Sequence, residues 1–157
     1  MARSRNNALF LAALAIAFAA CQKRVPTIVR DGKEISIEIA AKQDYDAAEA
    51  LYAKGRSSEA LRMYRTIVEQ FDRSKTADNA LFRISQIQLK QNQPAQAIST
   101  LESLVMKYPT GDIAPLAKLQ LGTLYYGQGN YKDAAMILSS IAHESPPDAP
   151  RRGDDET

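Results

Sequence analysis

Apolar residues in the middle of the chain recur at intervals of three and four residues, the spacing that is typical of amphipathic helices. This pattern predicts six helices, at residues 44–54, 57–71, 76–91, 94–107, 112–127 and 131–144. Ser57, Thr76, Asp112 and Asn130 are predicted N-caps, and Pro94 suits a first helical turn, where its missing N–H would have no partner. The chain is therefore expected to be all-α in this region.

The predicted helices form three similar pairs. Ala60, Ala97 and Ala134 occupy equivalent positions and are separated by 37 residues in each step. Agreement at this offset argues against a generic six-helix bundle and predicts an α-solenoid of three helix-turn-helix repeats. The other aligned columns are Leu61, Ile98 and Ala135; Tyr64, Leu101 and Leu138; Ile67, Leu104 and Ile141; the turn residues Gly55, Asn92 and Gly129; and the small residues Ala48, Ser85 and Gly122.

A different pattern occupies the start of the chain. A short basic stretch precedes thirteen apolar residues at 8–20, which as a helix would span about 20 Å and so fall short of a bilayer core of roughly 30 Å. Residues 1–20 are therefore predicted to be a signal peptide. Cys21, the single cysteine, follows directly. Ordinary cleavage after Ala19 would instead leave Cys21 as a free thiol.

The residues before this cysteine, "FAAC", resemble the lipobox of bacterial lipoproteins, although Phe18 stands where that family usually has leucine. The resemblance implies that Cys21 carries diacylglycerol and further fatty acids such as palmitate, which would hold the protein on a membrane. Gln22 follows in place of the aspartate that favours inner-membrane retention, so the resemblance implies the periplasmic face of the outer membrane of a Gram-negative bacterium.

Residues 21–42 are predicted to be a lipidated stem. Ile35, Ile37 and Ile39 alternate with polar residues, and Asp31-Gly32 suits a tight turn, so the stem can form a short hairpin. The repeats are assigned to residues 43–146 and a charged, disordered tail to residues 147–157.

The third helix pair, "LQLGTLYYGQGNYKDAAMIL", resembles a tetratricopeptide repeat. The first pair matches well and the second more loosely. The 37-residue spacing is similar to that of the Tol-Pal cell-division coordinator family and the outer-membrane barrel-assembly lipoproteins. The stem "VPTIVRDGKEI" is similar to that of lipoprotein activators of penicillin-binding proteins. The positions that carry the resemblance in the third pair are Leu121, Gly122, Tyr125, Gly129, Tyr131, Ala134 and Pro146.

In such families the first helix of each pair lines a groove that binds extended peptides or partner helices. Large apolar anchors beside polar residues fit that use, although several of these side chains could instead pack between neighbouring repeats. The groove columns at the 37-residue offset are Tyr45, Phe82 and Leu119; Glu49, Gln86 and Thr123; and Tyr52, Leu89 and Tyr126.

The last repeat is the most apolar of the three, and no further helix is predicted to cap it. Met136 and Ile137 are therefore predicted to dock a second protein or a second copy of the chain, unless they pack within their own repeat.

No residue pattern indicates catalysis, a metal site or a cofactor. His143 is the only histidine, and no nucleophile elbow or phosphate-binding glycine loop is present. Without Arg3 and Arg5 the chain has 18 basic and 18 acidic residues, so nothing in its charge indicates nucleic-acid binding.

The sequence thus predicts a non-enzymatic, outer-membrane-anchored scaffold that binds periplasmic proteins in cell-envelope biogenesis. A regulatory activator of a peptidoglycan synthase is the alternative, and a soluble periplasmic binder with a free thiol is a third interpretation.

Overall fold

The computed structural model describes residues 25–144. The expected signal peptide, Cys21 and the tail at 147–157 lie outside the described residues. The chain divides into two compact units, residues 1–37 and residues 38–157. None of the described helices is both long enough and apolar enough to cross a bilayer.

The described part of the first unit holds a two-stranded antiparallel hairpin of β1 (Thr27–Arg30) and β2 (Lys33–Ser36). Arg30 pairs with Lys33, so Asp31 and Gly32 form a two-residue turn, with φ of 51° and 72°. Positive φ at both positions is what such a hairpin turn requires, and it explains why Asp-Gly occurs here.

The first helix, α2 (Ile37–Ala53), begins earlier than the predicted residue 44 and takes in the end of the segment assigned to the stem. The alternating isoleucines cross this boundary, because only Ile35 belongs to a strand. Ala40 and Ala41 are fully buried, whereas Ile39 is 52% exposed. The residues that α2 buries here are therefore alanines and not the alternating isoleucines of the strand pattern.

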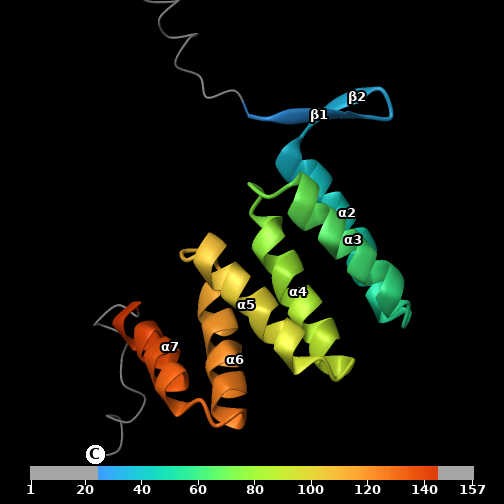
Figure 1. Cartoon of the computed structure of the whole chain (residues 1–157). Coiled ribbons are helices and arrows are strands. Elements are labelled where there is room, and N and C mark those ends of the chain that lie inside the picture. Colours follow the sequence, from blue (N-terminus) through green and yellow to red (C-terminus); the bar gives the residue numbers. More distant parts are fainter. Residues whose placement is uncertain (1–24, 145–157) are drawn as a thin grey trace, which may run out of the picture. The chain divides into compact units, whose positions relative to one another are not determined.

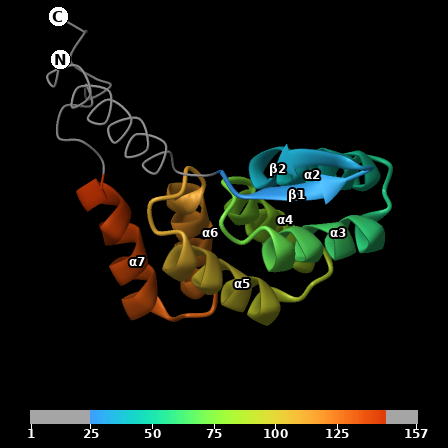
Figure 2. The same cartoon turned by 90° about the horizontal axis from the view of Figure 1, so that it is seen from above.

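The other described helices are α3 (Ser57–Gln70), α4 (Thr76–Lys90), α5 (Pro94–Lys107), α6 (Ala114–Gly127) and α7 (Tyr131–Glu144). Figure 1 shows them as successive antiparallel neighbours. From α3 onward each helix packs on the next one along the chain. Figure 2 shows α2, α4 and α6 in one layer and α3, α5 and α7 in the other. The predicted all-α repeat solenoid is confirmed.

Each helix pair is joined by the same turn. Gly55, Asn92 and Gly129 all have left-handed backbone, with φ of 76°, 58° and 78°. The residue after each of them donates its N–H to a carbonyl five residues earlier, as Arg56 does to Leu51 at 3.0 Å. This hydrogen bond satisfies one of the last carbonyls of the first helix. It requires a left-handed residue in the turn, which explains why this column holds only glycine and asparagine.

The predicted N-caps are wrong at three places, although α3 and α4 begin at the predicted residues 57 and 76. The N-caps of α3, α4 and α6 are Arg56, Lys75 and Ile113, and none of them makes a side-chain cap. Ser57 and Thr76 are instead the first helical residues. At α4 a distant residue takes over the capping, because the Glu38 carboxylate accepts the Lys75 N–H at 3.1 and 3.2 Å.

The core lies between the two layers and includes the fully buried Tyr64, Ile67, Leu101 and Leu104. Small residues let the paired helices approach. A Cβ added at Gly122 would lie 2.6 Å from Leu138 Cγ, so α6 and α7 touch at a point where only glycine fits.

Candidate protein-binding surface

The nine residues of the groove columns lie on α2, α4 and α6, three on each helix, at spacings that place them on one face. Their exposure differs sharply from one repeat to the next. They are partly covered in the first repeat, most covered in the second and most exposed in the third.

In the first repeat, Glu49 is the centre of a polar cluster. Its Oε1 accepts the Tyr64 hydroxyl at 2.5 Å and lies 2.8 Å from Arg83 Nε, while its Oε2 accepts from Arg83 Nη2 at 2.9 Å. Arg83 also donates to Gln86 Oε1 at 2.9 Å. The Tyr45 ring lies 5.6 Å from that of Tyr64. Glu49 thus connects α2 to both α3 and α4.

Tyr52 is the second link between α2 and α4. The Lys90 ammonium donates to its hydroxyl and lies 4.8 Å from the centroid of its ring. A cation over an aromatic face is a favourable contact. Glu49 and Tyr52 therefore both contact the next repeat through α4.

In the second repeat, one predicted groove residue is buried instead of exposed. Phe82 is only 7% exposed, so it is a core residue of the described chain and offers little surface to a partner. The physical reason is its central place, because α4 packs on helices at both sides, α3 and α5. Gln86 and Leu89 are partly exposed.

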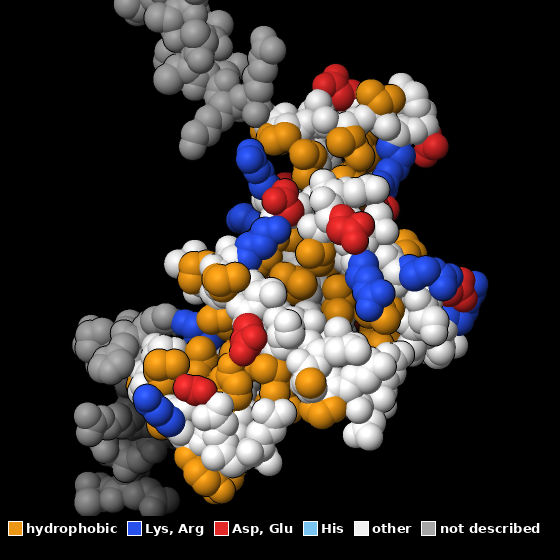
Figure 3. All heavy atoms as spheres, in the orientation of Figure 1, with side chains coloured by type: hydrophobic (Ala, Val, Ile, Leu, Met, Phe, Trp, Pro, Cys, Tyr) orange, Lys and Arg blue, Asp and Glu red, His pale blue; other side chains and the backbone are white. Residues whose placement is uncertain are grey.

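The third repeat presents its column to solvent. Leu119 is 51% exposed and Tyr126 is 66% exposed. Thr123, also exposed, donates its hydroxyl to the Leu119 carbonyl at 2.9 Å. The Tyr126 ring packs edge-on against Tyr131 at 5.2 Å, which leaves a two-ring aromatic surface beside an aliphatic one. Figure 3 shows hydrophobic side chains exposed over the α6–α7 end.

The two residues predicted to dock a partner at this end have different surroundings. Met136 is 65% exposed. Ile137 packs within its own repeat, because its Cγ2 is 3.0 Å from where a Gly122 Cβ would lie. The structure thus favours the alternative for Ile137, an intra-repeat contact.

The contacts that the groove columns make with Tyr64, Arg83 and Lys90 are not predicted from the sequence. Only the packing of α4 beside α2 and α3 brings them there. The nearest signal in the sequence is the pair Arg83 and Gln86, whose three-residue spacing permits contact along one helix.

Burial and hydrogen bonds to glutamate raise the pKa of three tyrosines in this unit. Burial, followed by the hydrogen bond to Glu49, raises the pKa of Tyr64. Burial also raises the pKa of Tyr45. The hydrogen bond to Glu102 raises the pKa of Tyr125 to about 12. These hydroxyls remain neutral donors at physiological pH, which suits packing and recognition.

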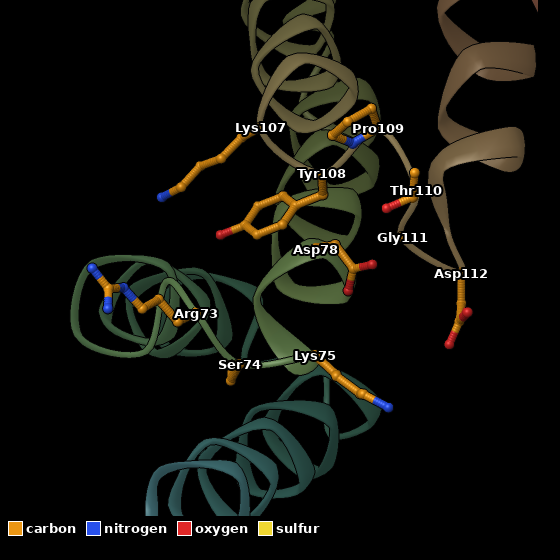
Figure 4. A pocket seen from close by; sticks show the side chains of 10 residues that line it. All are labelled: Arg73, Ser74, Lys75, Asp78, Lys107, Tyr108, Pro109, Thr110, Gly111 and Asp112. Atoms are coloured by element: carbon orange, nitrogen blue, oxygen red, sulfur yellow. The ribbon is translucent and has the colours of Figure 1, made fainter. Parts of the chain in front are cut away.

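A cavity of about 410 Å³ lies where the α3–α4 and α5–α6 connections meet. Figure 4 shows Asp78 directed towards Gly111 and Asp112, whereas Arg73 and Lys107 point away from it. The Asp78 carboxylate already accepts the Asn79 N–H at 2.6 Å, and burial raises its pKa. The charges around the cavity therefore do not converge on one ligand.

No group of three or more histidine, cysteine, aspartate or glutamate side chains within residues 25–144 is placed to hold a metal ion.

Comparison with known proteins agrees with this architecture. The family model described as "Tetratricopeptide repeat-like domain" matches residues 31–153, most of the chain. No curated protein matches significantly. Domains of this family generally mediate protein–protein interactions and are typically non-catalytic. With its three stacked helix pairs and this match, the chain belongs to the tetratricopeptide repeat-like family.

Proposed function

We propose that this protein is a lipid-anchored scaffold on the periplasmic face of the outer membrane, where its repeats bind proteins of cell-envelope biogenesis. The family supports a role in protein–protein interaction. The membrane location rests on the signal-like residues 1–20, Cys21 and Gln22.

The observation that carries the proposal is the exposed column of the third repeat. Leu119 and Tyr126 are large apolar side chains, each at least half exposed, with the hydroxyl of Thr123 between them. A few large side chains of this kind usually supply most of the binding energy of an interface. The partly exposed Gln86 and Leu89 extend the surface along α4.

Affinity purification of the full-length protein from detergent-solubilised envelopes tests this role. We expect the wild-type chain to recover defined envelope proteins and the Leu119→Ala, Tyr126→Ala double variant to lose them. Met106→Ala is the matched control, because Met106 is 81% exposed and lies on α5, outside the groove columns. Equal recovery by all three forms would contradict binding through this surface.

The anchor has its own test. We expect the wild-type chain to incorporate labelled palmitate in cells and to be processed in a globomycin-sensitive way, and Cys21→Ser to do neither. An unlabelled Cys21 would support instead the soluble periplasmic binder with a free thiol.

Regulation of a peptidoglycan synthase is the second candidate. Its support is the stem, whose sequence resembles that of synthase activators; residues 27–36 of this stem form the β1–β2 hairpin. Here the purified protein is expected to change the rate of glycan polymerisation or crosslinking by a partner synthase. Recovery of barrel-assembly or Tol-Pal components without any effect on synthase activity would favour the scaffold.

A further inference from the structure

Two of the helices that carry the groove columns begin without a cap of their own. Lys75 and Ile113 are the N-cap residues of α4 and α6, and neither side chain makes a capping hydrogen bond. The first N–H groups of a helix need an acceptor from outside the helix. For both N-cap residues, a carboxylate on the first helix of the preceding repeat accepts the backbone N–H.

At the start of α4 the acceptor is Glu38 of α2, whose two oxygens lie 3.2 and 3.1 Å from the Lys75 nitrogen. Glu38 is exposed. This junction has two further contacts between α2 and α4, made through Glu49 and through Tyr52. Glu38 is therefore one of several side chains that hold α2 beside α4.

At the start of α6 the acceptor is Asp78 of α4, which is only 5% exposed. Its carboxylate accepts the Asn79 N–H at 2.6 Å and also the Ile113 N–H. Burial raises the pKa of this carboxyl, whereas the two hydrogen bonds favour its charged form. One carboxylate thus bridges the N-terminal ends of α4 and α6, where both helix dipoles favour a negative charge.

The connection between α5 and α6 passes close to this carboxylate. A Cβ added at Gly111 would overlap Asp78 Oδ2, so the backbone approaches the side chain at a point where only glycine fits. Figure 4 shows Asp78 directed towards Gly111. The place of α6 beside α4 therefore depends on where this one side chain lies.

We infer that Asp78 is a positioning residue of the binding surface, because it holds the N-terminal ends of α4 and α6 together and so sets the spacing of the groove columns on these helices. The inference rests on the proposed function, which assigns partner binding to that surface. Gln86 and Leu89 lie on α4 and Thr123 and Tyr126 on α6, in the same layer (Figure 2). A fixed spacing prepares both helices for one partner at low cost.

The surroundings of Asp78 leave room for movement. The cavity of about 410 Å³ lies beside it, between the α3–α4 and α5–α6 connections. Helix α5 packs on both α4 and α6, and this contact does not involve the carboxylate. Without the bridge at Asp78 we therefore expect α6 to pivot about α5, so that the groove spacing becomes variable while the helices stay folded.

Distance measurement on the full-length chain tests the inference without a partner. Cys21→Ser leaves nitroxide labels at Gln86→Cys on α4 and Thr123→Cys on α6 as the only labelled sites. Asp78→Asn keeps the size of the side chain but replaces one acceptor oxygen with an amide N–H group. We expect this change to lengthen and broaden the distance between the two labels, measured by electron paramagnetic resonance.

Asp112→Asn is the matched control, because Asp112 lines the same cavity but is exposed. It should leave the distance unchanged. Gly111→Ala is an independent variant that keeps the charge of Asp78 but displaces its carboxylate, so it should lengthen the same distance. A second label pair, at Thr123 on α6 and Ser139 on α7, reports any general loosening of the third repeat and should not change in any variant.

Two results would overturn the inference. One is an unchanged distance between labels at 86 and 123 in both Asp78→Asn and Gly111→Ala. The other is an equal change in the pair at 123 and 139, which would show that Asp78 supports the folding of the repeat and not the spacing of α4 and α6.

Affinity purification from detergent-solubilised envelopes separates this inference from the proposed function. Unlabelled Asp78→Asn is expected to recover about a tenth of the envelope proteins that the wild type and Asp112→Asn recover, because few molecules keep the binding spacing. Full recovery despite a changed distance would overturn the role assigned to Asp78. If the wild type recovers no envelope protein while the distance still responds to Asp78→Asn, the scaffold fails and the spacing set by Asp78 stands.

Discussion

At the start of the helical stack, the positions that lack a neighbouring repeat carry glutamine, aspartate and alanine, whereas at its end they carry leucine and tyrosine. In the middle repeat, which has a neighbour on each side, the equivalent Ala80, Leu81 and Phe82 are buried, whereas Leu89, equivalent to Tyr126, stays partly exposed. The comparison shows that the first repeat can be recognised as terminal from its polar residues and alanines at positions that are buried in the middle repeat, whereas the last repeat cannot.

The largest expected effect is a loss of stability at Leu101, which is compared with the loss at Leu138, the equivalent position of the last repeat. Leu101→Ala removes a fully buried side chain from the middle repeat and should destabilise the unit by about 2–5 kcal/mol. Leu138→Ala removes a half-buried equivalent and should cost clearly less. Urea unfolding at low protein concentration measures both, and equal losses would show that Leu138 is as well packed in the last repeat as Leu101 is in the middle one.

The second prediction concerns the contact that holds the last pair together. A methyl group at Gly122 would overlap Leu138 Cγ, so Gly122→Ala should cost about 1–3 kcal/mol through overpacking. Gly127→Ala is the matched control, because nothing lies within 4 Å of its added Cβ. Thermal unfolding should show a lower melting temperature for the first variant alone. A neutral Gly122→Ala would mean that α7 can shift freely.

The third prediction addresses the polar cluster of the first repeat. Glu49→Ala leaves the Tyr64 hydroxyl and the Arg83 guanidinium without their shared acceptor and should cost about 1–2 kcal/mol. Thr123→Ala, at the equivalent exposed position of the last repeat, should be close to neutral. Denaturant titration of both variants gives the comparison. An unchanged free energy of unfolding in Glu49→Ala would show that the cluster does not stabilise the fold.

The smallest effect is a dependence on pH. Because the hydrogen bond to Glu102 raises the pKa of Tyr125 to about 12, the folded chain keeps this proton while the unfolded chain loses it above pH of about 10. Stability should therefore fall as pH rises from about 10 to 12. Tyr125→Phe should flatten this slope in pH-dependent unfolding, and an unchanged slope would contradict the assigned bond.

Much of the fold follows from local patterns in the sequence. Helical periodicity and the 37-residue offset predict six helices and three pairs, and residues such as Gly55 and Asn92 mark the turns because few others tolerate a left-handed backbone. The start of α2 is predicted less well, because Ile35, Ile37 and Ile39 follow a strand pattern although the last two belong to the helix.

The binding surface is only partly predictable from the sequence. The repeat offset places the three columns on one face of each first helix, but the exposure of each residue depends on neighbouring helices that its own position does not reveal. Phe82 and Leu119 are equivalent in sequence, yet one is buried and the other is half exposed. Likewise Arg83 reaches Glu49 from 34 residues away, a contact that no local pattern contains.

The packing of each helix from α3 to α7 mainly on its neighbours in sequence has a mechanical consequence. If a bound partner pulled on α7, the contact between α6 and α7 would carry the load first. Helix pairs would detach one after another from that end, and each extended residue would lengthen the molecule by about 3.5 Å. Under such a force the solenoid would lengthen in steps, one helix pair at a time.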